Sequence, residues 1–197
     1  MRPREARRDP YRRLAREQGL RSRAAFKLKE LNKSYRIIGP GFKVADLGCA
    51  PGGWTQVAVR AAGSRGAVVG VDLAYVEELP GATLVRGDVS DPAICDEILG
   101  ILGGRADAVI CDLSPEVTGN WSVDHARQIS LNYDCTRVAD AVLSRKGNAL
   151  FKVFDGPYSA EFRGYVAKKF SRVSLTKPQA SRKQSSELYF ACLGFLG

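Results

Sequence analysis

The sequence has a single histidine, His125, and no pair of cysteines in the Cys-x-x-C spacing. Zinc sites are usually assembled from clustered Cys and His residues, so this composition excludes the familiar zinc-binding patterns. The five cysteines are odd in number and lie far apart, at Cys49, Cys95, Cys111, Cys135 and Cys192. We therefore expect no metal site, and we expect the cysteines to be reduced, as in a cytoplasmic protein.

Long hydrophobic runs are also missing. No apolar stretch approaches the roughly 20 residues that a membrane-spanning helix needs. The arginine-rich N-terminus is followed by no apolar segment that could serve as a secretory signal. The sequence therefore predicts a cytoplasmic protein that does not contact a membrane, and its 197 residues are most simply a monomer with one folded domain.

Positive charge is concentrated near the N-terminus. Residues 1–36 contain 13 Lys and Arg against four Asp and Glu, which accounts for the whole net charge of +9. A basic segment on a neutral body is typical of proteins that bind a polyanion, so nucleic acid is the expected partner; the alternative is a solvated tail that only aids solubility. We divide the chain into a basic arm, residues 1–20, whose first ten residues we expect to be mobile, and a single domain, residues 21–197.

Strand and helix patterns alternate after residue 42. The expected strands are residues 43–47, 67–72, 83–86, 107–112, 148–154, 171–176 and 187–195. Helices are expected at residues 53–62, 91–102, 123–145 and 159–169, and an earlier one, capped by Ser22, runs through residues 23–31. This alternation indicates an α/β fold with a parallel sheet between two layers of helices. Because residues 177–186 form a short polar connection, the last strand should return antiparallel.

The segment Asp46-Leu-Gly-Cys-Ala-Pro-Gly-Gly-Trp54 joins the first strand to a helix. Glycines at such a junction let the backbone turn tightly and approach a ligand at the helix N-terminus. The dinucleotide fingerprint G-x-G-x-x-G is absent, because three residues separate Gly48 from Gly52. This spacing resembles the first loop of S-adenosylmethionine-dependent methyltransferases. The alternative is an ordinary glycine-rich turn without a ligand.

Three acidic residues follow successive strands. Asp72 ends one strand about 20 residues after the glycine loop, where nucleotide-binding folds bond ribose hydroxyls. Asp88 follows the next strand and could accept a hydrogen bond from an exocyclic amine, and Asp112 follows the one after that. Each of them could instead be a helix cap, since Asp is favoured in such turns.

Lys152 lies in Ala149-Leu-Phe-Lys-Val-Phe154, which should be a central strand. A buried lysine must reach water, pair with an acid or lose its proton. Lys152 is thus either a general base or a residue at a strand end whose ammonium group extends to water. The residues alone do not separate these two readings.

The chain resembles the FtsJ-type (RrmJ-like) RNA 2′-O-methyltransferases from about residue 20 to residue 193. The resemblance rests on separate segments at residues 22–28, 46–54, 112–115, 118–119, 151–154, 177–182 and 186–189. It implies a Rossmann-like, S-adenosylmethionine-dependent methyltransferase fold, with seven strands of which only the last is antiparallel. It also implies S-adenosylmethionine as methyl donor and no metal.

The resemblance further implies the site residues. The family's Lys-Asp-Lys-Glu catalytic set falls on Lys27, Asp112, Lys152 and Glu187. Its cofactor contacts fall on the glycine loop and the three acids, that is on Gly48, Gly52, Gly53, Trp54, Asp72, Asp88 and Asp112. Without the resemblance, Lys27 is interpreted as an exposed charge on an amphipathic helix and Glu187 as a surface residue.

The implied reaction is methylation of a ribose 2′-hydroxyl in RNA, with a uridine of large-subunit (23S-type) ribosomal RNA as the expected target. Lys152 is the expected general base, held by Asp112 and Glu187, although a steering role stays open. The basic N-terminal residues, with Arg172, Arg182 and Lys183, are expected to contact phosphates of ribosomal RNA or the large ribosomal subunit. Alternatives are a transfer RNA 2′-O-methyltransferase, a nicotinamide-dependent oxidoreductase and a non-catalytic RNA-binding factor.

Overall fold

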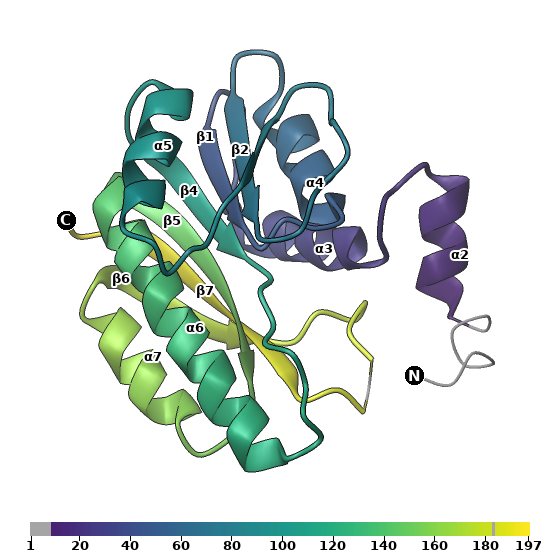
Figure 1. Ribbon diagram of the computed structural model, residues 1–197, viewed down its shortest axis with the longest axis vertical. Helices are drawn as coiled ribbons and strands as arrows, with labels where there is room; N and C mark the ends of the chain where they lie inside the picture. The colour runs from purple at the N-terminus through teal and green to yellow at the C-terminus, as the bar shows by residue number, and fades with distance from the viewer. Residues whose placement is uncertain (1–8, 183) are drawn as a thin grey trace.

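A seven-stranded sheet forms the centre of the computed structural model, which describes residues 9–182 and 184–197 (Figure 1). The strand order is β3-β2-β1-β4-β5-β7-β6. The strands are β1 (Lys43–Leu47), β2 (Ala67–Asp72), β3 (Thr83–Arg86), β4 (Ala106–Cys111), β5 (Leu143–Phe154), β6 (Phe170–Thr176) and β7 (Glu187–Phe195). Strand β7 pairs antiparallel with β5 and β6, whereas the other pairings are parallel. The predicted fold class is confirmed.

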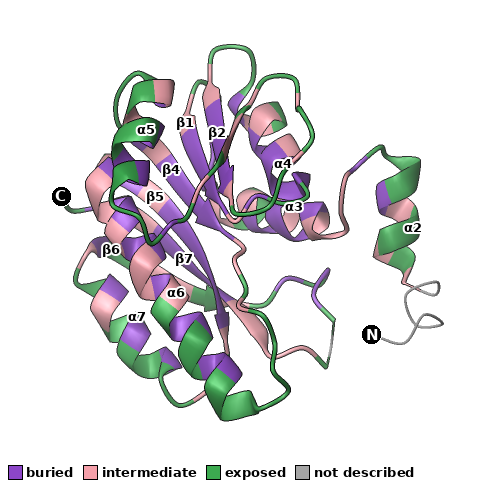
Figure 2. Ribbon diagram, viewed as in Figure 1, coloured by how far each residue is buried: buried purple, intermediate pink, exposed green. Residues whose placement is uncertain are grey.

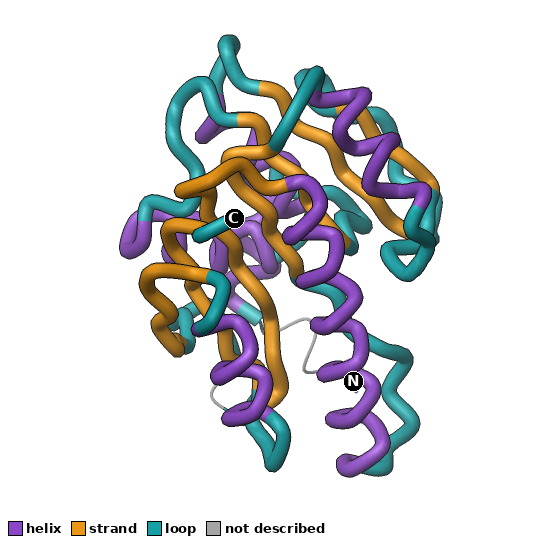
Figure 3. The backbone as a smooth tube through the Cα atoms, turned by 90° about the vertical axis from the view of Figure 1, so that its left-hand side faces the viewer, coloured by secondary structure: helices purple, strands orange, loops and turns teal. Residues whose placement is uncertain are grey.

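Helices cover both faces of this sheet (Figures 1 and 3). They are α2 (Pro10–Glu17), α3 (Ala24–Tyr35), α4 (Gly53–Ala62), α5 (Ala93–Leu102), α6 (Trp121–Val142) and α7 (Ser159–Ala167). Helices α3 and α4 bury Leu28 and Val57 in one hydrophobic core, and α5 and α6 bury Ile98 and Val138 in the other. The central strands are buried on both sides (Figure 2), which explains their continuous apolar sequences.

The junction between α6 and β5 differs from the prediction. Helix α6 ends at Val142 rather than residue 145, and β5 begins at Leu143 rather than residue 148. The register with β4 shifts here, because Ala106 pairs with Leu143 whereas Ala108 pairs with Asn148. This irregularity inserts extra residues into β5. The prediction missed them because it relied on regular alternation of side chains along a strand.

Ser22 is not the cap of α3. The N-cap residue is Arg23, and it makes no side-chain capping hydrogen bond. Ser22 instead packs against the start of α4, where a Cβ on Gly53 would lie 2.0 Å from the Ser22 hydroxyl oxygen. The predicted cap is therefore wrong, because a tertiary contact with α4 takes the place of the local one.

Part of the expected arm is a helix. Residues 1–8 lie outside the described residues, but Asp9 and Pro10, also expected to be mobile, begin α2. The Asp9 carboxylate accepts hydrogen bonds from the backbone N–H groups of Tyr11 and Arg12, and it also pairs with Arg23 and Arg182. The N-terminal cap and the ion pairs of Asp9 therefore hold α2 in place. The sequence of α2 is itself too polar to predict a helix that packs on the domain.

All five cysteines are buried and none forms a disulfide, and the Cys111 thiol donates a 3.1 Å hydrogen bond to Cys135 Sγ. Within residues 9–182 and 184–197, no helix is long and apolar enough to cross a membrane.

Candidate active site

The glycine loop lies between the end of β1 and the start of α4. Gly48 has φ +77° and Gly52, the N-cap of α4, has φ +102°, a region that favours glycine. A Cβ on Gly48 would lie 2.3 Å from Leu113 Cγ, and a Cβ on Gly52 would lie 2.8 Å from Arg21 Nη1. Both positions therefore require glycine, and the N-terminus of α4 opens at the carboxyl end of the sheet.

Asp72 connects this loop to the end of β2. Its carboxylate accepts hydrogen bonds from the backbone N–H groups of Ala50, at 2.9 Å, and Ala74, at 2.8 Å. Asp88 follows β3, the neighbouring strand, and accepts a 2.8 Å hydrogen bond from the Ser90 N–H. That hydrogen bond lowers the pKa of Asp88. Asp72 thus contacts the loop directly, whereas Asp88 lies after the neighbouring strand and stabilises its own turn.

Asp46 is a site residue that the sequence did not indicate by itself. It is fully buried at the carboxyl end of β1, and its Oδ2 accepts a 2.7 Å hydrogen bond from the Thr55 hydroxyl. Its Oδ1 has no hydrogen-bond partner among the described residues. Burial, with a smaller contribution from the charges of Asp112 and Asp72, raises its pKa to about 7. The sequence signal that could have identified Asp46 is an acidic residue within an otherwise apolar strand, β1.

Lys152 lies on β5, and its side chain is 5% exposed. Its Nζ donates a 2.6 Å hydrogen bond to the backbone oxygen of Asp112. The same Nζ lies 3.4 Å from Asp112 Oδ1 and 3.9 Å from Glu187 Oε1. The predicted central lysine therefore pairs with acids rather than extending into water.

Lys27 comes from α3 on the same face of the sheet. Its Nζ donates hydrogen bonds of 3.0 Å to both carboxylate oxygens of Glu187. Lys27 is buried, so its interpretation as an exposed helix charge was wrong. Burial opposes the ionisation of Glu187, but the charges of Lys27 and Lys152, with hydrogen bonds from Lys27 and Ser185, outweigh it and lower its pKa.

Tyr189 completes the cluster, although the sequence did not indicate it. Its hydroxyl donates a 2.8 Å hydrogen bond to Asp112 Oδ1. Burial raises its pKa well above the usual value, and the neighbouring carboxylates of Asp112 and Glu187 add to the effect. The tyrosine therefore stays a neutral donor. Its position two residues after Glu187 in β7, on the same face of the sheet, was the signal that could have found it.

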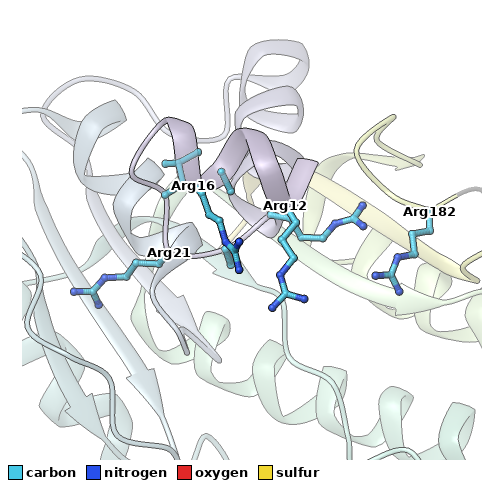
Figure 4. A pocket seen from close by; sticks show the side chains of 8 residues that line it. Arg12, Arg16, Arg21 and Arg182 are labelled. Atoms are coloured by element: carbon cyan, nitrogen blue, oxygen red, sulfur yellow. The ribbon is translucent and has the colours of Figure 1, made fainter. Parts of the chain in front are cut away.

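A basic pocket lies at helix α2 (Figure 4). Helix α2, the segment that follows it and the segment before β7 contribute Arg12, Arg16, Arg21 and Arg182. Arg172 does not line it, since it lies on the edge strand β6, and Lys183 lies outside the described residues. The lining combines arginines far apart in the sequence, a composition that suits phosphate, although the Arg21 guanidinium donates hydrogen bonds to the backbone oxygens of Glu77 and Glu78.

Comparison with known proteins agrees with this arrangement. The model of the FtsJ-like methyltransferase family matches residues 20–195. The chain belongs to this family. It is 68% identical over 193 residues to a ribosomal RNA large subunit methyltransferase E of Nitrosopumilus maritimus, covering 98% of each chain. It is 66% identical to the protein of that name from Cenarchaeum symbiosum, covering 100% of both.

The fold of this FtsJ-like chain is similar to that of a solved protein. A ribosomal RNA methyltransferase from Plasmodium falciparum superposes with a TM-score of 0.82 at 26% identity, covering 90% of this chain and 99% of that one. The family membership that the sequence indicated is therefore established.

Not every residue expected to contact the cofactor has a free side chain. The Trp54 indole is buried, and its Nε1–H donates a 2.9 Å hydrogen bond to the Ala24 oxygen. A contact from Trp54 or Gly53 to a ligand would thus use the backbone at the start of α4. For the part of the chain that the structure describes, no cluster of three His, Cys, Asp or Glu residues could hold a metal ion.

Proposed function

We propose that the protein transfers a methyl group from S-adenosylmethionine to a ribose 2′-hydroxyl of large-subunit ribosomal RNA. One observation carries this proposal: Lys27, Asp112, Lys152 and Glu187 converge within hydrogen-bond and ion-pair distances beside the glycine loop. The names of the similar proteins from Nitrosopumilus and Cenarchaeum support the choice of RNA. We extend their substrate class to this chain, with a uridine as target.

The glycine loop and its neighbouring acids fit the proposed methyl donor. S-adenosylmethionine supplies an electrophilic methyl group on a positively charged sulfur. The loop at Gly48 and Gly52 lets the backbone approach it, and Asp72 and Asp88 would bond its ribose and adenine. Burial is the main cause of the raised pKa of Asp46, and the nearby carboxylates of Asp112 and Asp72 add to it. A cationic ligand would relieve that repulsion.

Lys152 is the group that we propose to remove the hydroxyl proton. A neutral lysine amine can donate one N–H to the Asp112 backbone oxygen, 2.6 Å away, and keep its lone pair for the proton. The ammonium group formed is then stabilised by the carboxylates of Asp112 and Glu187. Lys27 keeps Glu187 ionised, so it acts on Lys152 through that carboxylate.

The basic pocket supports RNA as the acceptor. Residues 1–20 would act as an RNA-binding arm and residues 21–197 as the catalytic domain of a cytoplasmic monomer. Arginines that line one pocket can bind phosphates on either side of the reacting nucleotide. A-form RNA hides its base edges, so an unpaired or opened segment would enter the site.

The choice of RNA is tested by offering three substrates with labelled S-adenosylmethionine: large ribosomal subunits, protein-free ribosomal RNA and transfer RNA. Incorporation into large-subunit RNA, as particle or free, supports the proposal, and the comparison shows which form is preferred. Incorporation into transfer RNA alone would favour the alternative that shares the four catalytic residues. Lys152→Ala serves as the control for methylation by contaminants.

A further inference from the structure

Four aromatic rings gather at the start of α6 and the end of β5, outside the catalytic cluster. The Trp121 ring lies 5.9 Å from His125 and 5.9 Å from Phe154, and the His125 ring lies 5.5 Å from Tyr158 with an angle of only 7°. Trp121 is 46% exposed and Tyr158 is 49% exposed, whereas His125 is buried. Two large aromatic rings are thus open to solvent around one covered ring.

The covered ring holds the exposed ones in place. His125 Nε2 accepts a 3.1 Å hydrogen bond from the Tyr158 backbone N–H. A Cβ on Gly156 would lie 2.7 Å from the His125 ring, so this loop packs directly against it. Burial lowers the pKa of His125, although Asp155 opposes the effect, so the ring stays uncharged. The His125 ring thus contacts both exposed rings and is neutral, which suits a stacking surface.

One polar atom of this arrangement has no partner. His125 Nδ1 is buried and makes no hydrogen bond within the described parts of the chain. Because Nε2 accepts a hydrogen bond, the single N–H of the neutral ring is on Nδ1, which is therefore an unsatisfied donor. Buried unpaired donors and exposed large rings both lower the stability of a fold, so their combination at one place points to binding.

The aromatic cluster borders the catalytic residues directly. Phe154 is the cross-strand partner of Glu187 in the pairing of β5 with β7. Gln128, three residues after His125 on α6, donates hydrogen bonds to the backbone oxygens of Leu113 and Lys152. Asp124 fixes the intervening loop by accepting hydrogen bonds from Thr118 and Gly119. The exposed rings are therefore fixed relative to Lys152 through both strand and helix.

We propose that Trp121 and Tyr158 form a stacking surface for an unpaired nucleobase of the substrate RNA, next to the nucleotide whose ribose is methylated. The inference rests on the proposed function, since RNA is the substrate that the neighbouring site would take. Aromatic rings bind single-stranded bases through their faces, and every base has such a face. The basic pocket would bind the phosphates, whereas this surface would orient the nucleotide chain.

Tryptophan fluorescence tests the contact itself. The protein has two tryptophans, of which Trp54 is buried and Trp121 is exposed. A bound single-stranded oligouridylate should quench the emission, and an abasic oligoribonucleotide of equal length and charge should not. Trp121→Phe should remove the quenching while RNA still binds. Equal quenching by the two oligomers, or none when oligouridylate is bound, would overturn the proposal.

Kinetics separate this surface from the proposed reaction. Trp121→Ala and Tyr158→Ala should each raise the KM for ribosomal RNA about tenfold, leave the KM for S-adenosylmethionine unchanged and be largely rescued by Phe at the same position. Leu196→Ala, an equally exposed apolar residue after β7 at the opposite end of the sheet, is the matched control and should have no effect. An unchanged KM for RNA in both alanine variants would refute the stacking surface while leaving the methyl transfer intact. Absence of transfer by the wild type would refute the proposed function, and the quenching would still test the surface.

Discussion

Lys27 and Glu187 are separated by 160 residues in the sequence, yet the lysine Nζ lies 3.0 Å from both carboxylate oxygens. Their side chains are only 9% and 20% exposed. Glu187 in turn lies 3.9 Å from Lys152, so one carboxylate joins a lysine of α3 to a lysine of β5. This contact therefore links helix α3 to strands β5 and β7 at the candidate active site.

Removing Lys27 should therefore destabilise the protein through Glu187. Lys27→Met leaves a largely buried carboxylate without its nearest cation, which should lower the free energy of unfolding by about 1–3 kcal/mol at pH 7. The double variant Lys27→Met with Glu187→Gln should recover most of that loss, because neither charge remains. Urea unfolding of the four proteins of this cycle measures it, and strictly additive losses would contradict the coupling.

The same pair gives a pH dependence. The native pKa of Glu187 lies below its usual value of 4.5, so the unfolded state binds more protons around that pH. Its contribution to stability is present above pH 4.5 and is lost as the pH falls through the lower native pKa. In Lys27→Met this contribution should shrink, so the acidic part of the stability curve should be flatter than in the wild type.

Lys152→Ala should reduce methyl transfer by at least about 10²-fold, the usual contribution of a general base. Affinity for S-adenosylmethionine, measured by calorimetry, should change less than about threefold, because the proposed donor contacts lie on the glycine loop and the acids. Lys168→Ala, an exposed lysine after α7, is the matched control and should be fully active. If Lys152→Ala lost its affinity for S-adenosylmethionine, the result would indicate that Lys152 binds the cofactor rather than acting as the general base.

Asp46 should make the protein less stable as the pH rises. Its native pKa of about 7 exceeds the usual 3.8, so between these values the folded state binds the extra proton. Unfolding free energy should then fall by about 2–3 kcal/mol from pH 5 to pH 8 through this group. Asp46→Asn should remove that decline, and thermal melts across the range would show it. Parallel curves for the two proteins would contradict a raised native pKa.

The basic pocket should act mainly through charge. Arg12→Ala combined with Arg16→Ala should weaken RNA binding and reduce the log–log salt slope by about 0.7 for each phosphate that the pocket no longer binds. Arg145→Ala combined with Lys146→Ala removes the same charge from exposed residues at the start of β5 and is the matched control. Equal effects in both double variants would indicate that net charge, rather than this pocket, attracts RNA.

Much of the fold follows from periodicity. The bounds of β1, β2, β3 and α4 agree with the sequence prediction to the residue, because apolar strand cores end sharply at Gly, Asp or polar turns. Helix α2 and the part of β5 before residue 148 could not be predicted, since tertiary ion pairs of Asp9 hold the first and an irregular register with β4 shapes the second.

The site was predictable to different degrees. Strand ends pointed to Asp72, Asp88 and Asp112, and the glycine spacing pointed to the loop. Lys27 and Glu187 were named only through the family resemblance, because their burial arises from the packing of α3 on the sheet and leaves no local sequence signal. Tyr189 and Asp46 were not predicted, since their roles depend on hydrogen bonds to residues distant in the chain or on full burial.

The position of the transferred methyl group distinguishes ribose methylation from every other methyl transfer to RNA. Large-subunit RNA methylated by the wild type should be digested with alkali and separately with nuclease, and the labelled products identified by mass spectrometry. A methyl group on the 2′-oxygen blocks alkaline cleavage at that nucleotide, so we predict a labelled, alkali-resistant dinucleotide that is absent with Lys152→Ala. Label in an alkali-released mononucleotide, which would place the methyl group on a base, would contradict the proposed reaction.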